Sequence, residues 1–225
     1  MASLQQGRYA LLVAGGSGLR MGAVLPKQFL SLGGRPVLMH TLERFAPLVE
    51  RLILVLPEEQ RGYWVELCAQ HSFTLPHEVT AGGETRFHSV SAGLSLLPEE
   101  GLVAVHDGVR PLLSAGLIEA CFEAAARAGA ALPALPVTDS LRQLHEGSSR
   151  AVDRADYVAV QTPQTFQLRQ LHAAYRQPYR PSFTDDASVW EAAGFAAPEL
   201  VPGEARNIKL TQPLDLKLAE LLLKD

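Results

Sequence analysis

Cysteine is scarce in this chain, whose 225 residues include only Cys68 and Cys121. We interpret both as buried thiols of a protein kept in a reducing compartment, because two cysteines do not make a disulfide framework. No apolar run approaches the roughly 18 residues that a membrane-spanning helix needs, and no basic segment followed by an apolar stretch opens the chain. The sequence therefore predicts a cytoplasmic protein without a membrane partner.

An excess of positive charge is also absent, since 20 lysines and arginines stand against 24 aspartates and glutamates, for a formal net charge of −4. A general nucleic-acid-binding surface would be basic, so we expect no nucleic acid partner. This balance does not exclude a small anionic ligand, because a few local cations decide whether such a ligand binds.

Three common motifs are missing as well. A P-loop requires Lys-Ser or Lys-Thr directly after its closing glycine, whereas Ala23 follows Gly22. The dinucleotide fingerprint requires a third glycine at the position that Met21 occupies. No Gly-x-Ser-x-Gly elbow is present, which leaves a Ser-His-Asp triad without support.

What the chain does contain is a glycine-rich loop that directly follows an apolar run over residues 9–14. The run predicts a buried strand, and glycines after it let backbone N–H groups close around phosphate oxygens. The loop residues expected to bind a nucleotide are Ala14, Gly15, Gly16, Ser17 and Gly18. Arg20 and Lys27 add two cations, which favours a polyphosphate over a neutral ligand. Glycine-rich turns also occur without a ligand, so the glycines alone do not decide between the two interpretations.

Short apolar runs alternate with helical patterns along most of the chain. The runs that predict strands lie at 9–14, 51–56, 74–80, 102–105, 130–135, 197–201 and 207–211. The patterns that predict helices lie at 36–45, 58–70, 86–97, 114–127, 167–176, 185–193 and 213–223. This alternation is typical of βαβ units, so we expect one three-layer α/β domain over residues 1–225 with a mostly parallel twisted sheet.

Residues 136–160 interrupt this alternation with short strand-like pieces joined by Glu146-Gly147-Ser148-Ser149. The pattern predicts an inserted β-arm in the form of a hairpin. An isolated hairpin has little core of its own, so we expect the arm to pack on another surface such as a second subunit.

Polar residues follow several of the expected strands, and in open parallel sheets ligands bind at the carboxyl ends of strands. The glycine loop, the Gly82-Gly83 turn and residues 106–111 can therefore share one face. Asp107 is placed to hold a divalent ion beside phosphates, although an ordinary turn aspartate fits its position equally well. His106 has no partner histidine or cysteine at ligand spacing, so we interpret it as a packed neighbour.

No side chain in these stretches is an evident nucleophile, which is explained if a phosphate of the substrate attacks. A phosphate monoester is mostly dianionic near neutral pH, with a second pKa of about 6. Such a group needs positioning and charge neutralisation rather than activation by a base.

Ten short motifs occur in a fixed order along nearly the whole chain. They are AGGSGLRM at 14–21, PKQ at 26–28, GGETR at 82–86, SV at 89–90, HDGVRP at 106–111, VTDS at 137–140, VDR at 152–154, QTPQ at 161–164, TDDAS at 184–188 and NIKLT at 207–211. With them the chain resembles the 2-C-methyl-D-erythritol 4-phosphate cytidylyltransferase family of isoprenoid-precursor synthesis. The first motif is shared by many sugar-phosphate nucleotidyltransferases, whereas the later ones are much more specific.

The resemblance implies a Rossmann-like nucleotidyltransferase fold and transfer of CMP from CTP to the 4-phosphate of methylerythritol, with release of pyrophosphate and with Mg²⁺ as cofactor. It implies that Arg20 and Lys27 are catalytic and stabilise the charge of an in-line attack on the α-phosphorus. It also implies that five further residues bind the nucleotide together with the five loop residues: Gly83, Glu84, Ser89, Asp107 and Gly108. The metal would lie near Asp107.

The residues that the resemblance implies for binding methylerythritol phosphate are Arg110, Ser140, Arg154, Thr184 and Lys209. In the family the arm interlocks two subunits, which implies a homodimer in which Ser140 and Arg154 serve the partner's site. Three positions depart from the family pattern: Ser140 where threonine is usual, Arg206 where an acidic residue is frequent, and Gly108-Val109 in place of Ala-Ala.

Other interpretations stay open at the level of sequence. Arg154 and Lys209 can be surface ion-pair partners, and Thr184 can be a helix N-cap. A cytidylyltransferase for another polyol phosphate, such as ribitol 5-phosphate, shares the CTP side of the site. A nucleotide-sensing module without catalytic activity shares the fold, but has no need of cations that stabilise a transition state.

Overall fold

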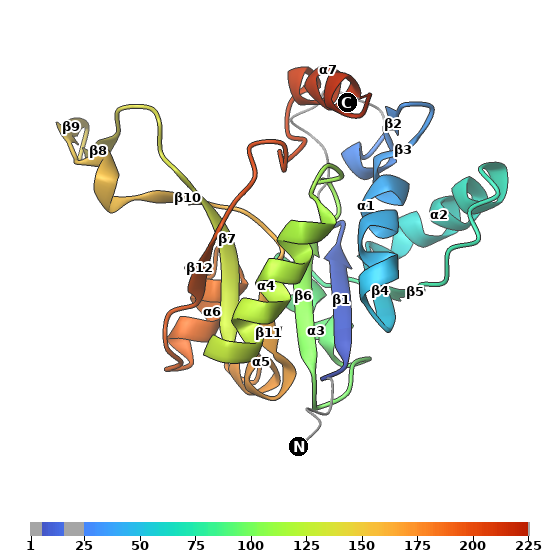
Figure 1. Cartoon of the computed structure of the whole chain (residues 1–225), viewed down its shortest axis with the longest axis horizontal. Coiled ribbons are helices and arrows are strands. Elements are labelled where there is room, and N and C mark those ends of the chain that lie inside the picture. Colours follow the sequence, from blue (N-terminus) through green and yellow to red (C-terminus); the bar gives the residue numbers. More distant parts are fainter. Residues whose placement is uncertain (1–5, 16–24, 225) are drawn as a thin grey trace.

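The computed structural model describes residues 6–15 and 25–224, and its centre is one twisted sheet between two layers of helices (Figure 1). The strands of this sheet are β1 (Arg8–Val13), β4 (Arg51–Leu56), β5 (Glu78–Ala81), β6 (Leu102–Asp107), β7 (Ala130–Pro136), β10 (Val158–Val160), β11 (Gln164–Gln167) and β12 (Glu199–Pro202). The helices are α1 (Val37–Phe45), α2 (Glu58–Gln70), α3 (Arg86–Leu94), α4 (Ala115–Ala128), α5 (Leu168–Ala174), α6 (Asp186–Ala192) and α7 (Pro213–Leu222).

The middle of the sheet is parallel, as the alternation of apolar runs and helices predicts. β1 pairs with β4 on one side and β6 on the other, and β5 continues the parallel order beyond β4. β11 runs antiparallel to both β6 and β7, while β12 pairs parallel with β7. β10 pairs antiparallel with a later stretch of β7. The expected three-layer, mostly parallel α/β architecture is confirmed.

Side chains of each central strand alternate between two buried layers. In β1, Ala10 and Leu12 pack in one cluster, to which α1, α2 and α4 contribute, and Leu11 and Val13 pack in the other, with α3, α5 and α6. Because both faces of the sheet are covered, these strands are apolar throughout rather than alternating with polar residues. The sheet is thereby a rigid base, and the loops at its carboxyl ends are placed by buried strands.

Helix boundaries follow local capping chemistry. The Ser114 side chain accepts a hydrogen bond from the Leu117 backbone N–H, which makes it the expected N-cap of α4. At α6 the N-cap is Asp185, whose side chain accepts from the Ser188 N–H, so the alternative role of Thr184 as this cap is wrong.

Within the described residues, no helix is both long and apolar enough to cross a membrane.

Several elements differ from the sequence-based expectation. Residues 207–211 form no strand, because their backbone bonds elsewhere: the Leu210 N–H donates to the Val109 carbonyl (3.0 Å) and the Asn207 carbonyl accepts from Arg110. Conversely, β11 inserts between β6 and β7 with Phe166 as its one large apolar side chain, too little for a pattern. A small hairpin of β2 (Ser31–Leu32) and β3 (Arg35–Pro36) was also not expected.

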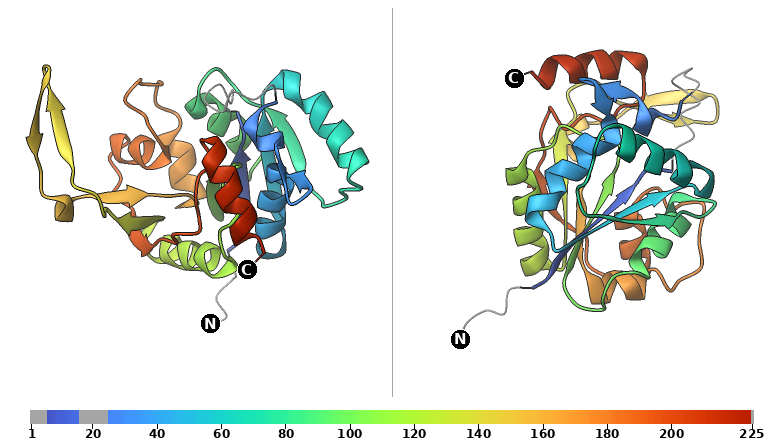
Figure 2. Two further views of the ribbon diagram at one scale, coloured as in Figure 1. Left: turned by 90° about the horizontal axis from the view of Figure 1, so that it is seen from above. Right: turned by 90° about the vertical axis from the view of Figure 1, so that its right-hand side faces the viewer.

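The arm is a hairpin of β8 (Arg142–His145) and β9 (Ser148–Ala151) that projects away from the rest of the chain (Figure 2). Every residue of both strands is exposed, including Leu144 at 82%. The side chains that stabilise it bond across the hairpin, as Arg142 Nε does to Ser149 Oγ at 2.8 Å. The arm thus has no core of its own, as its composition predicts.

Candidate active site

A cavity of about 290 Å³ lies at the carboxyl ends of the central strands. β1 and β6 end side by side there, with Val13 paired to Asp107 in the last step of the register. The cavity is lined by Val13, Ala14, Gly15, Lys27, Gln28, Gly83, Glu84, Thr85, Arg86, Ser89, Asp107, Val109 and Lys209. The three loops expected to share one face therefore meet around a single hollow.

The first wall of the cavity comes from the start of the glycine loop and from the turn Lys27–Phe29. The Gln28 side chain is fully buried and donates from Nε2 to the Ala14 carbonyl at 2.8 Å and to Gln60 Oε1 at 2.6 Å. The first of these bonds ties the turn that carries Lys27 to the end of β1. The other predicted residues of this loop, Gly16, Ser17, Gly18 and Arg20, lie outside the described residues.

The second wall is the glycine turn between β5 and α3. The Gly83 N–H donates to Ser89 Oγ at 3.2 Å, so the turn and the first helical residues hold each other. A Cβ at Gly82 would lie 2.7 Å from Ser89 Oγ, and one at Gly83 would lie 2.4 Å from His88 Cβ. Both glycines are needed for this close approach, which leaves the backbone of the turn facing the cavity.

Asp107 is the buried carboxylate of the site, and three cations surround it. Lys209 Nζ lies 2.7 Å from Oδ2, Arg110 Nε lies 3.6 Å from Oδ2, and Arg86 Nε lies 3.6 Å from Oδ1. Burial acts to raise the pKa of Asp107, but Arg86, Lys209 and Arg110 together hold that pKa well below its ordinary value. Asp107 is therefore an anion throughout the neutral and mildly acidic range.

The donor set bears on whether Mg²⁺ fits. Among residues 6–15 and 25–224, no three His, Cys, Asp or Glu side chains gather closely enough to enclose a metal ion. Mg²⁺ is commonly held by one or two carboxylates, with substrate phosphates and waters as its other ligands. Asp107 Oδ1, approached by Arg86 only at 3.6 Å, fits this second kind of site. The site suits a metal that arrives with a triphosphate, not one caged by protein.

His106 is a buried neighbour of this carboxylate, as expected, and its ring is held at both nitrogens. The Asp107 N–H donates to Thr162 Oγ1 at 3.1 Å, the Thr162 hydroxyl lies 3.0 Å from His106 Nδ1, and Nε2 lies 3.1 Å from the Arg110 carbonyl. Because the Arg110 carbonyl can only accept a hydrogen bond, the proton of the neutral ring is assigned to Nε2, and Nδ1 then accepts from the Thr162 hydroxyl. Burial lowers the pKa of His106 to about 3, so the ring is neutral.

Lys209 is presented by a segment that crosses the ends of the strands. Asn207 is fully buried, its Nδ2 donates to the Thr162 carbonyl at 2.8 Å, and its own carbonyl accepts from Arg110 Nη1 at 2.8 Å. Lys209 and Arg110 are thus brought together at Asp107. Gly108 lies behind the cavity wall, where its N–H donates to the Val13 carbonyl at 2.9 Å.

Three predicted residues lie apart from the cavity. Thr184 is exposed and lines a small neighbouring hollow that it shares with Arg86. Ser140 and Arg154 lie in the arm segment, and Arg154 donates to the Thr138 carbonyl there. Both belong to the segment between β7 and β10, and this segment extends away from the ends of β1 and β6 (Figure 1).

Several buried polar residues of the site were given no role on the basis of the sequence. They are Gln28, Arg86, Thr162, Tyr175, Asp186 and Asn207. All except Tyr175 fall inside the ten motifs. Their position inside a motif was therefore the only available sign in the sequence that these polar residues belong to the site. Their partners are distant in sequence, as with Arg86 and Asp186, and no local pattern pairs them.

The chain is similar to known proteins of one family. The family model for 2-C-methyl-D-erythritol 4-phosphate cytidylyltransferase matches residues 9–225. The chain belongs to this family. A relative of that name from Porphyromonas gingivalis strain W83 is 57% identical over 220 residues, covering 98% of this chain and 99% of the relative. Another relative of that name, from Bacillus velezensis, is 41% identical over 221 residues, and the match covers 95% of this chain and 94% of the relative.

Solved structures give the same result for the fold. The crystal structure of 2-C-methyl-D-erythritol 4-phosphate cytidylyltransferase from Thermus thermophilus aligns with a TM-score of 0.79 at 36% identity, covering 99% of this chain and all of that one. A crystal structure of 4-diphosphocytidyl-2C-methyl-D-erythritol synthase aligns with a TM-score of 0.81 at 32% identity, covering 98% of this chain and all of that one. The nucleotidyltransferase fold expected from the motifs is confirmed.

Replacement of Thr162 by valine tests the hydrogen-bonded support of Asp107. Thr162→Val leaves both the Asp107 N–H and His106 Nδ1 buried without a partner, so we expect the free energy of unfolding to fall by about 1–3 kcal/mol. Urea denaturation measures this change. Thr162→Ser keeps the hydroxyl and is the matched control. Equal stability of the valine and serine variants would contradict the network.

Proposed function

We propose that this chain catalyses the reaction for which its family is named, the transfer of CMP from CTP to 2-C-methyl-D-erythritol 4-phosphate with release of pyrophosphate. The observation that carries the proposal is the cavity where Lys27, Asp107 and Lys209 meet two glycine turns. Backbone donors and fixed cations around one hollow suit a triphosphate, and the later motifs suit a polyol phosphate as the second substrate.

The chemistry needs no protein nucleophile. A 4-phosphate oxygen of methylerythritol phosphate attacks the α-phosphorus, the bond from that phosphorus to the bridging oxygen breaks, and pyrophosphate leaves with the electron pair. Arg20 and Lys27 neutralise the charge that builds on the phosphorus-bound oxygens, which is where preorganised cations stabilise the transition state most. Mg²⁺, held by Asp107 and the triphosphate, would supply further charge neutralisation.

Nucleotide recognition falls to the two glycine turns. Ala14 and Gly15 follow β1, while Gly83 and Ser89 face them from the start of α3. The Ala14 N–H already donates to the Val55 carbonyl and the Gly83 N–H to Ser89 Oγ. We therefore assign recognition of the base edge to the other backbone groups of the two turns. Gly16, Ser17, Gly18 and Glu84 would complete the nucleotide site, with Gly108 packed behind it.

Binding of the second substrate is assigned to the cations beyond Asp107. Arg110 and Lys209 lie at Oδ2 of Asp107 and would orient the methylerythritol phosphate. Thr184 would add a hydroxyl. In the free chain both cations are paired with Asp107. Each can share its charge with an incoming phosphate, because an ammonium and a guanidinium carry several donors.

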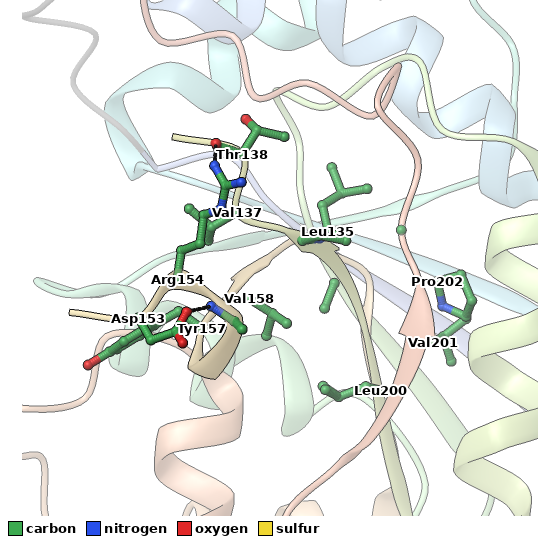
Figure 3. A pocket seen from close by; sticks show the side chains of 14 residues that line it. Leu135, Val137, Thr138, Asp153, Arg154, Tyr157, Val158, Leu200, Val201 and Pro202 are labelled. Carbon is green, nitrogen blue, oxygen red and sulfur yellow. Dashed lines mark hydrogen bonds between the residues drawn. The ribbon is translucent and has the colours of Figure 1, made fainter. Parts of the chain in front are cut away.

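We infer that Ser140 and Arg154 reach the substrate from a second copy of the chain. A groove at the base of the arm is lined by apolar residues of β7, β10 and β12 (Figure 3), and Tyr157, Val158 and Leu200 are each about half exposed. An exposed apolar surface beside an arm without a core supports a homodimer in which each arm lies against the partner. The two free thiols, Cys68 and Cys121, support a cytoplasmic location.

Pyrophosphate release tests the reaction and its substrate. With CTP and Mg²⁺, we expect turnover with 2-C-methyl-D-erythritol 4-phosphate and little with ribitol 5-phosphate, because the chain belongs to the family named for the first substrate. Preference for ribitol 5-phosphate would replace the proposed substrate. Tight CTP binding without turnover on either polyol phosphate would make the chain a nucleotide sensor instead.

Alanine variants of the two catalytic cations test the mechanism. In Lys27→Ala and Arg20→Ala we expect kcat to fall by about 10²–10³-fold, while KM for CTP changes much less, since the cations act on charge present mainly in the transition state. Steady-state kinetics with either substrate varied measures both constants. The reverse result, a raised KM with unchanged kcat, would leave both residues as ground-state binding groups.

Complementation tests whether the arm serves the partner. Lys27→Ala and Arg154→Ala variants should each be nearly inactive, and refolding them together should restore about a quarter of the parental activity, because half of the dimers are mixed and each has one intact site. Activity assays after equal mixing, alongside each variant refolded alone, measure the recovery. Failure to recover activity in dimers shown to be mixed would place Arg154 in its own chain's site.

A further inference from the structure

Arg86 opens α3 and contacts carboxylates on two sides. Its Nη1 and Nη2 donate to the two oxygens of Asp186 at 2.8 and 2.7 Å, and its Nε lies 3.6 Å from Asp107 Oδ1. The Tyr175 hydroxyl donates to Asp186 Oδ1 at 2.6 Å, and Asp186 is completely buried. Arg86 is at the same time part of the cavity wall.

Stability alone is a poor explanation for this arrangement. Asp186 is completely buried and the Arg86 side chain is 29% exposed, so most of the pair has lost its contact with water. That loss is costly, and a well-packed apolar pair of similar size is often as stable as a buried ion pair. An apolar replacement would be easy here, because Phe87 already stacks on Tyr175 and on Phe183 beside the pair. The buried charges are better explained by what Arg86 does on its other side, where Asp107 lies.

The geometry of guanidinium makes Asp186 the residue that aims Arg86. The group is planar, so once both Nη atoms are fixed on one carboxylate, the direction of the Nε–H is fixed as well. That remaining donor lies on the side of Asp107 Oδ1. Lysine in place of Arg86 would keep the charge but lose this fork.

The support of Asp186 is itself rigid. Gln164 in β11 is buried, and its Oε1 accepts from the backbone N–H groups of Asp186 and Ala187 at 3.0 Å each. Its Nε2 donates to Asp185 Oδ2 at 2.8 Å. The start of α6 is thus fastened to the central sheet, which is the kind of support that a precise site requires.

We propose that Arg86, clamped by Asp186, which the Tyr175 hydroxyl supports in turn, is a positioning residue that holds Asp107 Oδ1 toward the triphosphate side of the cavity. The inference deepens the proposed function and rests on it. Asp186 is the first residue of α6 and stands two residues after Thr184.

Three variants and one control test the clamp. Arg86→Lys keeps the charge without the fork, Asp186→Asn keeps the shape without the charge, and Tyr175→Phe removes one hydroxyl. The control is Glu78→Gln, which disrupts another two-point arginine pair, Arg51 with Glu78 at 2.8 and 3.0 Å, at the opposite end of β4. Thermal melting establishes that each protein is folded before kinetics are measured.

We expect kcat of Arg86→Lys and Asp186→Asn to fall by about 10- to 100-fold, the usual cost of losing a residue that orients a metal-site carboxylate, with a smaller fall in Tyr175→Phe. KM for CTP should change by much less than kcat. Calorimetry should show that Mg²⁺ strengthens CTP binding less in the variants than in the parent. Glu78→Gln should match the parent in every measurement.

The outcomes separate the clamp from the proposed reaction. If folded Arg86→Lys and Tyr175→Phe match the parent in kcat and in the effect of Mg²⁺ on CTP binding, the clamp is overturned even if Asp186→Asn fails to fold. An inactive parent would overturn the proposed function, and the calorimetric comparison of the variants would then still decide whether Arg86 positions Asp107.

Discussion

The pairing of one buried carboxylate with three cations is the interaction on which the rest of the site depends. Asp107 ends the central strand β6, and Arg86, Arg110 and Lys209 reach it from α3, from its own turn and from the segment after β12. Without Asp107 the three cations would repel one another in a partly buried cavity. With Asp107 between them they form a stable positive surface that can exchange part of its pairing for phosphate oxygens.

The framework around this centre follows from the sequence, because the central strands are apolar on both faces. The predicted strand at 51–56 and helix at 58–70 match β4 and α2 in full, and the glycine turns fall at strand ends, where a ligand site is expected. Residues 207–211 show the limit of such reasoning. Their apolar alternation predicts a strand. In the fold they instead cross the carboxyl ends of the strands, and their backbone bonds to Val109 and Arg110.

The polar supports of the site could not be predicted for a different reason. Thr162 meets His106 and Asp107 across 56 and 55 residues, and Arg86 meets Asp186 across 100. Periodicity reports only which residues share a face of one element, so pairings of this length carry no local signal. Arg86, Thr162 and Asp186 fall inside the motifs, but only the fold shows which residues they touch.

The chain divides its tasks between a rigid body and an arm that has no core. The cavity, over the residues that the structure describes, lies within one chain and is held by strands buried on both faces. Arg154 lies shortly after the hairpin of β8 and β9, whose residues are all exposed. An exposed hairpin beside an apolar groove gains its order from burial against another surface. If that surface is a second copy, assembly and completion of the substrate pocket are one event, and the nucleotide half can form without its partner while the polyol half cannot.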